Sequence, residues 1–144
     1  MSGRLIVEET LHATTVAING HAVMIEGPSG AGKSDLALRL IDRGAVLVSD
    51  DRTIVKAERG ALRATAPDTI AGRIEVRGLG ILPMPHADGS TVALIVRLTD
   101  EIERLPLTQV ERCIAGIAIP EVTINPHEAS APIKVELALK WQLG

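Results

Sequence analysis

The sequence predicts a single α/β domain, over residues 1–144, with an unusually large antiparallel share. The chain has 144 residues, a length typical of one domain. Apolar residues make up 46% of it and aromatic residues only 1%, so the core must be aliphatic, as in buried strands covered by helices. A strand, a glycine-rich loop, a helix and another strand come first, and most of the rest alternates between apolar and polar residues.

The first third of the chain predicts four regular elements. β-Branched residues in ATTVAI favour a strand, and Asn19-Gly20 then tolerates the positive φ angles of a two-residue hairpin turn. The following apolar strand leads directly into the glycine-rich loop. Leucines at helical spacing mark the helix, which Gly44 should end. We therefore expect strands over 13–18 and 21–27, a helix over 33–43 and a short buried strand over 45–50.

The remainder predicts antiparallel structure and a final helix. Residues 52–67 alternate around Arg59-Gly60, which is typical of a hairpin, and residues 72–85 predict a short strand that breaks into a Gly/Pro-rich loop. Residues 90–100 predict a strand of central character, whereas 101–126 are compatible with helix or strand. Residues 128–142 predict a helix, because three apolar residues are spaced by four: Ile133, Leu137 and Trp141.

Composition excludes several classes of function. The net charge of −3 and the near absence of aromatic residues argue against nucleic-acid binding. No stretch approaches the length of a membrane span, and no signal peptide is visible, so we expect a cytoplasmic protein. The lone cysteine, Cys113, fits a reducing compartment, and we expect a buried structural thiol there.

The glycine-rich loop matches the pattern G-x-x-x-x-G-K-[ST], which binds nucleoside phosphates. Glycines let backbone N–H groups approach phosphate oxygens, and the following helix directs its positive end at the same anions. The lysine would reach the β- and γ-phosphates, and the final serine hydroxyl would bind Mg²⁺. The loop consists of Gly27, Pro28, Ser29, Gly30, Ala31, Gly32, Lys33 and Ser34.

Acidic residues follow the loop closely. Asp50 and Asp51 end the next strand, where one carboxylate could face Mg²⁺ and the other could accept a proton from an attacking hydroxyl. The alternative is that both simply open a turn. Asp100 also ends an apolar strand, although a solvated strand end explains it as well. Glu75 and Arg77 share a strand face beside glycines, as functional residues or as plain surface alternation.

These motifs together resemble the catalytic domain of HPr kinase/phosphorylase. The resemblance rests on the stretch from Leu11 to Asp51 followed by IEVRGLGI at 74–81, and it fades after residue 81. It implies a P-loop-containing, phosphoenolpyruvate-carboxykinase-like kinase fold with a mixed sheet. It also implies a Mg²⁺- and ATP-dependent enzyme that phosphorylates a serine of the phosphocarrier HPr and can phosphorolyse the phosphoserine.

The resemblance also assigns roles to residues. It implies that Asp51 is the base in the kinase direction and the proton donor in phosphorolysis, with Asp50 as its neighbour, and that His12 assists the transfer. Glu75 matches a glutamate that helps Ser34 to hold Mg²⁺. Arg104, in IERLP, matches an arginine that assists catalysis, although the loops around it are shortened.

Two departures from the family pattern stand out. Longer members carry an additional N-terminal domain, so this chain resembles the short form known from α-proteobacteria. Before the last helix, longer members have a basic R-x-G-R-N-like loop. The corresponding residues here, 125–132, are NPHEASAP, and the loss of the basic loop puts metabolite control and phosphorolysis in question.

Family members form hexamers, which implies a homo-oligomer. The alternatives to a carrier-protein kinase are a small-molecule kinase of the same fold and a non-catalytic nucleotide-binding regulator.

Overall fold

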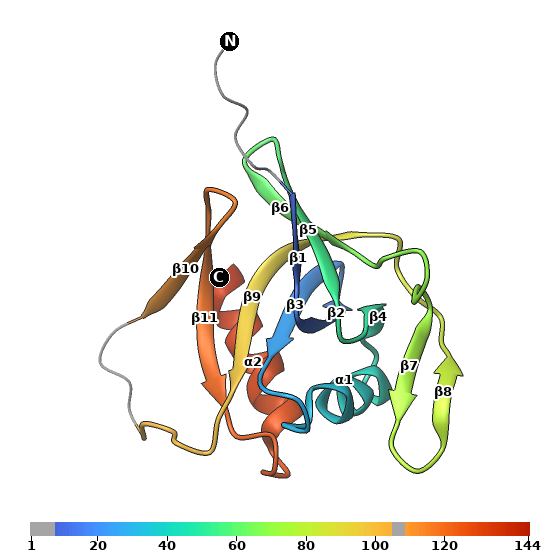
Figure 1. The fold of residues 1–144 in the computed structure, drawn as a ribbon. Helices are drawn as coiled ribbons and strands as arrows, with labels where there is room; N and C mark the ends of the chain where they lie inside the picture. Colours follow the sequence, from blue (N-terminus) through green and yellow to red (C-terminus); the bar gives the residue numbers. More distant parts are fainter. Residues whose placement is uncertain (1–7, 105–108) are drawn as a thin grey trace.

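A computed structural model describes residues 8–104 and 109–144 (Figure 1). Residues 1–7 and 105–108 lie outside the described part of the chain. The expectation that the N-terminus carries no signal peptide falls mostly on residues 1–7 and therefore lies outside it too. The described elements in chain order are β1 (Glu8–Leu11), β2 (Ala13–Ile18), β3 (His21–Glu26), α1 (Lys33–Asp42), β4 (Val46–Ser49), β5 (Thr53–Glu58), β6 (Ala61–Thr65), β7 (Arg73–Val76), β8 (Gly80–Pro83), β9 (Ser90–Leu98), β10 (Val110–Ile114), β11 (Ile117–Ile124) and α2 (Ala131–Leu143).

A mixed, nine-stranded sheet forms the body of the molecule. Seven strands follow one another in the order β1-β5-β6-β9-β3-β2-β4, and β11 pairs with β9 and carries β10 at its other edge. The β3–β9 and β9–β11 pairs are parallel, and all other pairs in this sheet are antiparallel. The predicted α/β class with a large antiparallel share is therefore confirmed, and β9 is central as expected.

Local sequence signals explain the first elements. The turn between β2 and β3 has positive φ at Asn19 and Gly20, +50° and +82°, as the two-residue hairpin requires. Helix α1 begins at Lys33, inside the predicted loop, and the chain leaves it at Gly44 with φ +111°. The hairpin predicted around Arg59-Gly60 forms between β5 and β6.

Two aliphatic cores lie on the two faces of the sheet. Both helices pack on one face, where Leu36 and Leu40 of α1 and Val135 and Leu139 of α2 meet side chains of β2, β3 and β9 (Figure 1). On the other face, alanines and aliphatic residues of the strands themselves pack together, including Met24 and Leu62. No aromatic residue belongs to either core, as the composition predicts.

The structure differs from the expected strands in three places. Residues 72–85 form the β7–β8 hairpin and not one strand with a loop, because Gly78 and Gly80 adopt positive φ and turn the chain back. The undecided segment 101–126 contains a second hairpin, β10–β11, which turns at Ala115 and Gly116. Strand β1 was not expected, because its four residues pair only with β5 at the edge of the sheet.

The apolar stripe that predicts the final helix is not its buried side. Ile133, Leu137 and Trp141 are 42%, 60% and 77% exposed. The helix carries a second stripe at the same spacing, Ala131, Val135 and Leu139, and this stripe is buried. Its shorter side chains let the helix approach β9 and β11 more closely.

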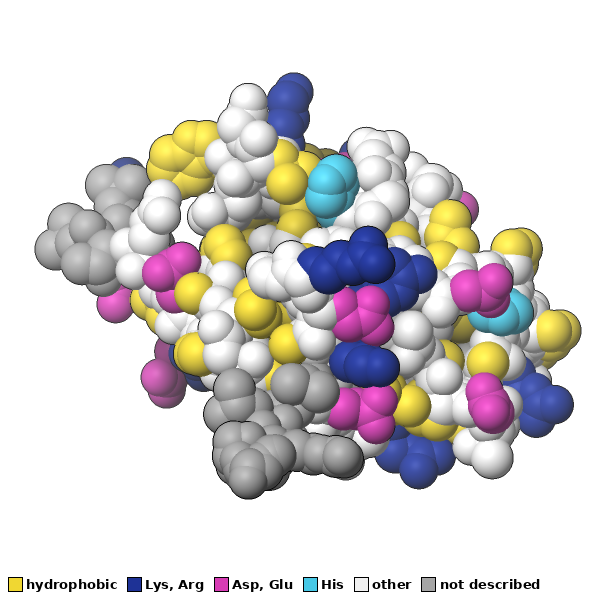
Figure 2. Space-filling view, turned by 90° about the horizontal axis from the view of Figure 1, so that it is seen from above, with side chains coloured by type: hydrophobic (Ala, Val, Ile, Leu, Met, Phe, Trp, Pro, Cys, Tyr) yellow, Lys and Arg dark blue, Asp and Glu magenta, His cyan; other side chains and the backbone are white. Residues whose placement is uncertain are grey.

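The expectation of a buried Cys113 is wrong. The residue is exposed, because β10 pairs with β11 alone in the described part of the chain and nothing there covers this side of the strand. The surface seen in Figure 2 mixes acidic, basic and apolar side chains, without the basic stripe of a nucleic-acid interface on this face. Among the described residues, no helix is both long and apolar enough to span a membrane.

Candidate active site

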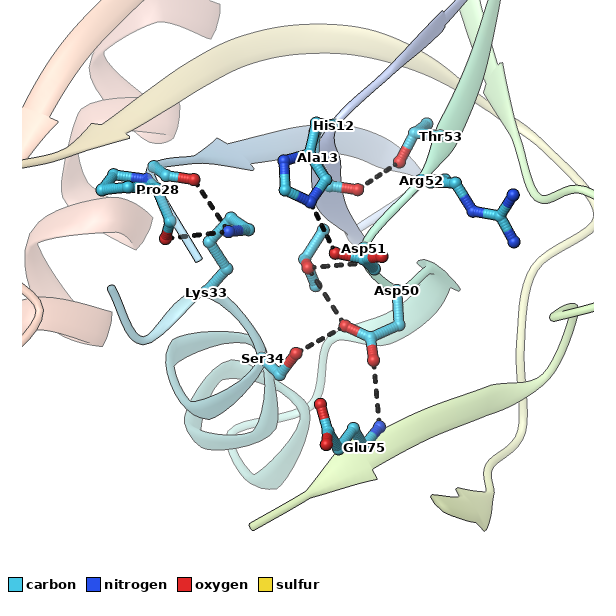
Figure 3. Close-up of polar contacts among 12 residues, drawn as sticks. His12, Ala13, Pro28, Lys33, Ser34, Asp50, Asp51, Arg52, Thr53 and Glu75 are labelled. Atoms are coloured by element: carbon cyan, nitrogen blue, oxygen red, sulfur yellow. Dashed lines mark hydrogen bonds and ion pairs between the residues drawn. The ribbon is translucent and has the colours of Figure 1, made fainter. Parts of the chain in front are cut away.

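Three strand ends bring the predicted site residues together (Figure 3). Strand β2 runs antiparallel to both β3 and β4, so the amino end of β2 lies beside the carboxyl ends of the other two. His12 precedes β2, the glycine-rich loop follows β3, and the acidic pair follows β4. Residues that are far apart in the chain therefore meet where these three strands end, although this sheet is not doubly wound.

The glycine-rich loop folds around its own lysine. Lys33 is buried, and its Nζ donates to the carbonyl oxygens of Gly27, at 2.7 Å, and Pro28, at 3.2 Å. Gly30 and Gly32 have φ angles of +80° and +102°, which only glycine adopts without strain. An ammonium group and the amino end of α1 thus lie at the same point, an arrangement that attracts phosphate.

Asp50 is buried and accepts three hydrogen bonds. Ser34 Oγ donates to Asp50 Oδ1 at 2.6 Å, and Thr14 Oγ1 donates to the same oxygen at 3.0 Å. The backbone N–H of Glu75, on β7, donates to Asp50 Oδ2 at 2.9 Å. Three donors around one carboxylate fit its ionised form, which only accepts. Asp50 therefore ties the start of α1, strand β2 and hairpin β7–β8 to the end of β4.

Asp51 lies in a different environment. Its side chain is 62% exposed, and its Oδ1 lies 2.7 Å from His12 Nε2. Its φ is +68°, unusual for a residue other than glycine. The N–H of Arg52 donates to the carbonyl of Asp50 at 2.7 Å, so Asp51 is the central residue of a three-residue γ-turn. The aspartates do form a turn, but both also carry polar partners from other elements.

The other predicted residues divide into two groups. Figure 3 shows the carboxylate of Glu75 on the side of the site where Ser34 lies. Arg77, Asp100 and Arg104 are exposed, and within residues 8–104 and 109–144 none of the three makes a hydrogen bond or ion pair with the site. The structure therefore brings Glu75 to the site and leaves the predicted role of Arg104 without a contact.

Magnesium fits the donor set at the loop. Mg²⁺ prefers oxygen ligands and takes only one or two carboxylates from a protein, together with phosphates and water. The hydroxyl of Ser34 and the carboxylate of Asp50 lie 2.6 Å apart and supply such oxygens. No group of three or more His, Cys, Asp or Glu side chains suited to a metal occurs in the described part of the chain.

Two functional candidates were missed by sequence reasoning. Thr14 is completely buried, donates to Asp50 and accepts the N–H of Asp51 at 3.0 Å. In the sequence it is one β-branched residue of a strand, and its partners follow 36 and 37 residues later.

Arg112 of β10 pairs with Glu26, the last residue before the loop, and with Glu121. Desolvation lowers the pKa of Arg112, but hydrogen bonds with Glu26 and Glu121 raise it above its ordinary value.

The comparisons with known proteins decide the family. Residues 3–138 match the model described as HPr Serine kinase C-terminal domain. The chain belongs to this family. Its resemblance to HPr kinase/phosphorylase is thereby confirmed.

Relatives of this HPr kinase family support the assignment. The chain is 34% identical over 133 residues to HPr kinase/phosphorylase of Clostridium tetani, and the match covers 84% of the chain and 44% of that protein. It is 39% identical over 140 residues to the enzyme of Azoarcus sp., covering 86% of the chain and 44% of the relative. The chain thus spans less than half the length of these relatives.

A solved structure has the same fold. The HPr(Ser) kinase/phosphatase of Coxiella burnetii superposes with a TM-score of 0.82 at 28% identity, covering 94% of this chain and 96% of that one. The predicted kinase fold with a mixed sheet is therefore confirmed. The names of these relatives state kinase chemistry on HPr.

Proposed function

We propose that this chain is an ATP- and Mg²⁺-dependent kinase that transfers a phosphoryl group to a serine of an HPr-like phosphocarrier protein. The observation that carries the proposal is the position of Asp51: an exposed carboxylate beside His12, next to the buried Asp50–Ser34 pair at the amino end of α1. A base accessible to a protein substrate thus lies beside a phosphate loop. Membership of the HPr kinase family supports the choice of substrate.

The loop would bind the β- and γ-phosphates of ATP. Backbone N–H groups at Gly30 and Gly32 and the amino end of α1 would face the phosphate oxygens. Lys33 donates to two loop carbonyls in this structure, and its Nζ would turn from them to the phosphates. The positive charge of Lys33 then offsets charge that grows on the transferred group.

Ser34, Asp50 and Glu75 would hold Mg²⁺. The hydroxyl of Ser34 is one oxygen ligand, and the carboxylate of Asp50 would bind the metal directly or through water. The carboxylate of Glu75 lies on the same side of the site in Figure 3. When bound, the metal neutralises phosphate charge and aligns the γ-phosphoryl group for in-line attack.

Asp51 would act as the general base. A serine hydroxyl of the carrier would attack the γ-phosphorus while its proton passes to the carboxylate of Asp51. The bond between the γ-phosphorus and the bridging oxygen of the β-phosphate would break, and ADP would leave. His12 Nε2, 2.7 Å from Asp51 Oδ1, would fix the orientation of that carboxylate. In phosphorolysis the same proton would return to the serine oxygen while inorganic phosphate accepts the phosphoryl group and forms pyrophosphate.

Incubation of the protein with γ-labelled ATP, Mg²⁺ and purified HPr tests the proposal. We expect label on a serine of HPr. Loss of this label when inorganic phosphate replaces ATP in a second incubation would show that the chain also catalyses phosphorolysis. Label on a small metabolite instead would identify a small-molecule kinase. ATP binding with no labelled product would identify a nucleotide-binding regulator, and either result would overturn the proposal.

The same family resemblance leads us to propose a homo-oligomer, with the hexamer as the expected size. Sedimentation velocity of the purified chain would show a species of six times its 15.2 kDa mass. A monomer over the full concentration range would contradict this expectation. We also propose that the protein is located in the cytoplasm, because its proposed substrate, an HPr-like carrier, belongs to the phosphotransferase system.

A further inference from the structure

We propose that Thr14 is a positioning residue that fixes both aspartates of the site through one hydroxyl group. Its Oγ1 donates to Asp50 Oδ1 at 3.0 Å and accepts the backbone N–H of Asp51 at 3.0 Å. A hydroxyl has one proton, so donation to Asp50 leaves its lone pairs for Asp51. The inference rests on the proposed function, because it assigns Thr14 a role in placing the metal-side carboxylate and the base.

The two hydrogen bonds of the Thr14 hydroxyl are called the Thr14 clamp below. The backbone conformation of Asp51 explains why the site needs this clamp. A non-glycine residue at φ +68° in a γ-turn is strained and persists only where its surroundings fix it. The turn itself contributes the bond from Arg52 N–H to the Asp50 carbonyl and the bond from Ser49 Oγ to the Arg52 carbonyl. Thr14 joins this turn to the neighbouring strand β2 through two bonds, one to the carboxylate of Asp50 and one from the N–H of Asp51 itself.

The position of Thr14 on β2 makes the clamp rigid. Thr14 is 0% exposed, and β2 is paired on both sides, with β3 and with β4. The β2–β4 register shifts between Thr15 and Val16, one residue beyond Thr14, and this irregularity lets the end of β4 turn across the amino end of β2. A hydroxyl on a strand that is paired on both sides therefore fixes the carboxylate of Asp50 and the backbone of Asp51 relative to β2.

The chain contains a matched control on the same strand. Thr15 is also 0% exposed, and its Oγ1 bonds to Thr53 Oγ1 at 2.8 Å, on the other face of β2. Thr15→Val and Thr14→Val make the same chemical change at equal burial, one residue apart. Only Thr14→Val removes a hydrogen bond from the acidic pair, whereas Thr14→Ser retains it.

The test compares these variants in phosphoryl transfer to HPr. We expect Thr14→Val to lower kcat by about 10- to 100-fold with little change in the KM for ATP, because misplaced reacting groups slow the chemical step. Thr14→Ser should restore kcat to within about threefold of wild type, and Thr15→Val should leave it near wild type. Equal losses in Thr14→Val and Thr15→Val, or wild-type kcat in Thr14→Val, would overturn the inference.

A second readout does not depend on activity. Amide hydrogen exchange at Asp51, followed by NMR, should be slow in the wild type and in Thr15→Val and about tenfold faster or more in Thr14→Val. Unchanged exchange at Asp51 in Thr14→Val would overturn the clamp whatever the enzyme does. If the wild type fails to phosphorylate HPr while this difference in exchange is present, the proposed function fails and the clamp stands.

Discussion

Asp50 and Asp51 differ in burial and in partners although they are adjacent in the chain. Asp50 is 8% exposed and accepts from Ser34, Thr14 and the Glu75 backbone, so its carboxylate cannot turn toward an incoming hydroxyl without losing these bonds. Asp51 is exposed and has His12 as its side-chain partner. Environments of this kind separate the roles of neighbouring carboxylates. Asp50 suits the metal side of the site and Asp51 suits the base.

Substitution of the base tests this division at the level of one residue. We expect Asp51→Asn to lower the rate of phosphoryl transfer by roughly 10²- to 10⁴-fold, because an amide cannot accept the serine proton. Nucleotide binding should be retained, because the phosphate loop does not bond to Asp51. Single-turnover kinetics and titration with ATP measure the two effects separately.

Asp68→Asn is the matched control for this variant. Asp68 is exposed in the segment between β6 and β7 and forms no ion pair in the described parts of the chain. Its amide variant should transfer phosphate at the wild-type rate. Full activity of Asp51→Asn with purified HPr would contradict the assignment of the base.

At the level of the element, the start of α1 depends on a glycine. Gly32 has φ +102°, and a Cβ added there would lie 3.6 Å from Cβ of Pro126, an ordinary contact. Gly32→Ala should therefore destabilise the fold by about 1–2 kcal/mol through backbone strain alone. It should also weaken ATP binding, because relief of the strain moves the N–H groups of the loop. Denaturant unfolding and ATP titration measure these two effects.

Gly60→Ala is the control for Gly32→Ala, because it adds backbone strain at a position away from the phosphate loop. Gly60 has φ +79° at the tip of the β5–β6 hairpin, where an added Cβ meets no atom within 4 Å. We expect a similar loss of stability, about 1–2 kcal/mol, with unchanged affinity for ATP. Equal affinity losses in the two variants would show that weaker ATP binding follows from reduced stability and not from the shape of the loop.

The segment between β11 and α2 is held by α1. Arg39 donates to the carbonyl of Pro126 at 2.6 Å and to that of Glu128 at 3.4 Å. Loss of these charged donors in Arg39→Ala should destabilise the fold by about 1–3 kcal/mol and loosen the segment beside Gly32. Thermal unfolding measures the loss, and hydrogen exchange over residues 125–130 locates it.

Arg43→Ala is the comparison for Arg39→Ala. Arg43 also links the two helices, through Glu136 at 2.8 Å, and its hydrogen bond with Glu136 raises the pKa of the guanidinium. The pair is exposed to water, where ion pairs contribute little. We expect the unfolding temperature of this variant to stay at the wild-type value. A larger loss in Arg43→Ala than in Arg39→Ala would contradict the anchoring role of Arg39.

At the level of the whole molecule, local signals predicted the part of the fold that forms the site. Strands at 13–18 and 21–26, the loop and α1 follow from a hairpin turn, a P-loop pattern and a glycine stop, each readable within a few residues. Strand β1 was not predicted, because it forms by pairing with the distant strand β5. The segment of the β10–β11 hairpin was left open between helix and strand, because the pairing of β11 with β9 selects the strand. The buried side of α2 was missed because the helix has two apolar stripes and only the sheet selects one.

The candidate site was predicted to a similar extent. Spacing and residue type identified the loop and the acidic pair and made Glu75 a candidate, and the family resemblance assigned roles to His12 and Glu75. The structure places the side chain of His12 and the backbone of Glu75 beside the acidic pair. Thr14 could not be found, because its importance follows from a hydroxyl group that meets a turn formed 36 residues later. Arg104 illustrates the opposite case: the resemblance assigns it a role, but it is exposed and makes no hydrogen bond or ion pair with the site within the described residues.

Mass spectrometry of HPr after incubation with this protein, ATP and Mg²⁺ tests the central claim most directly. We predict that HPr gains one phosphoryl group on a serine, that the gain requires all three components, and that Asp51→Asn prevents it while Asp68→Asn does not. Unmodified HPr in the presence of a folded protein that binds ATP would contradict the claim.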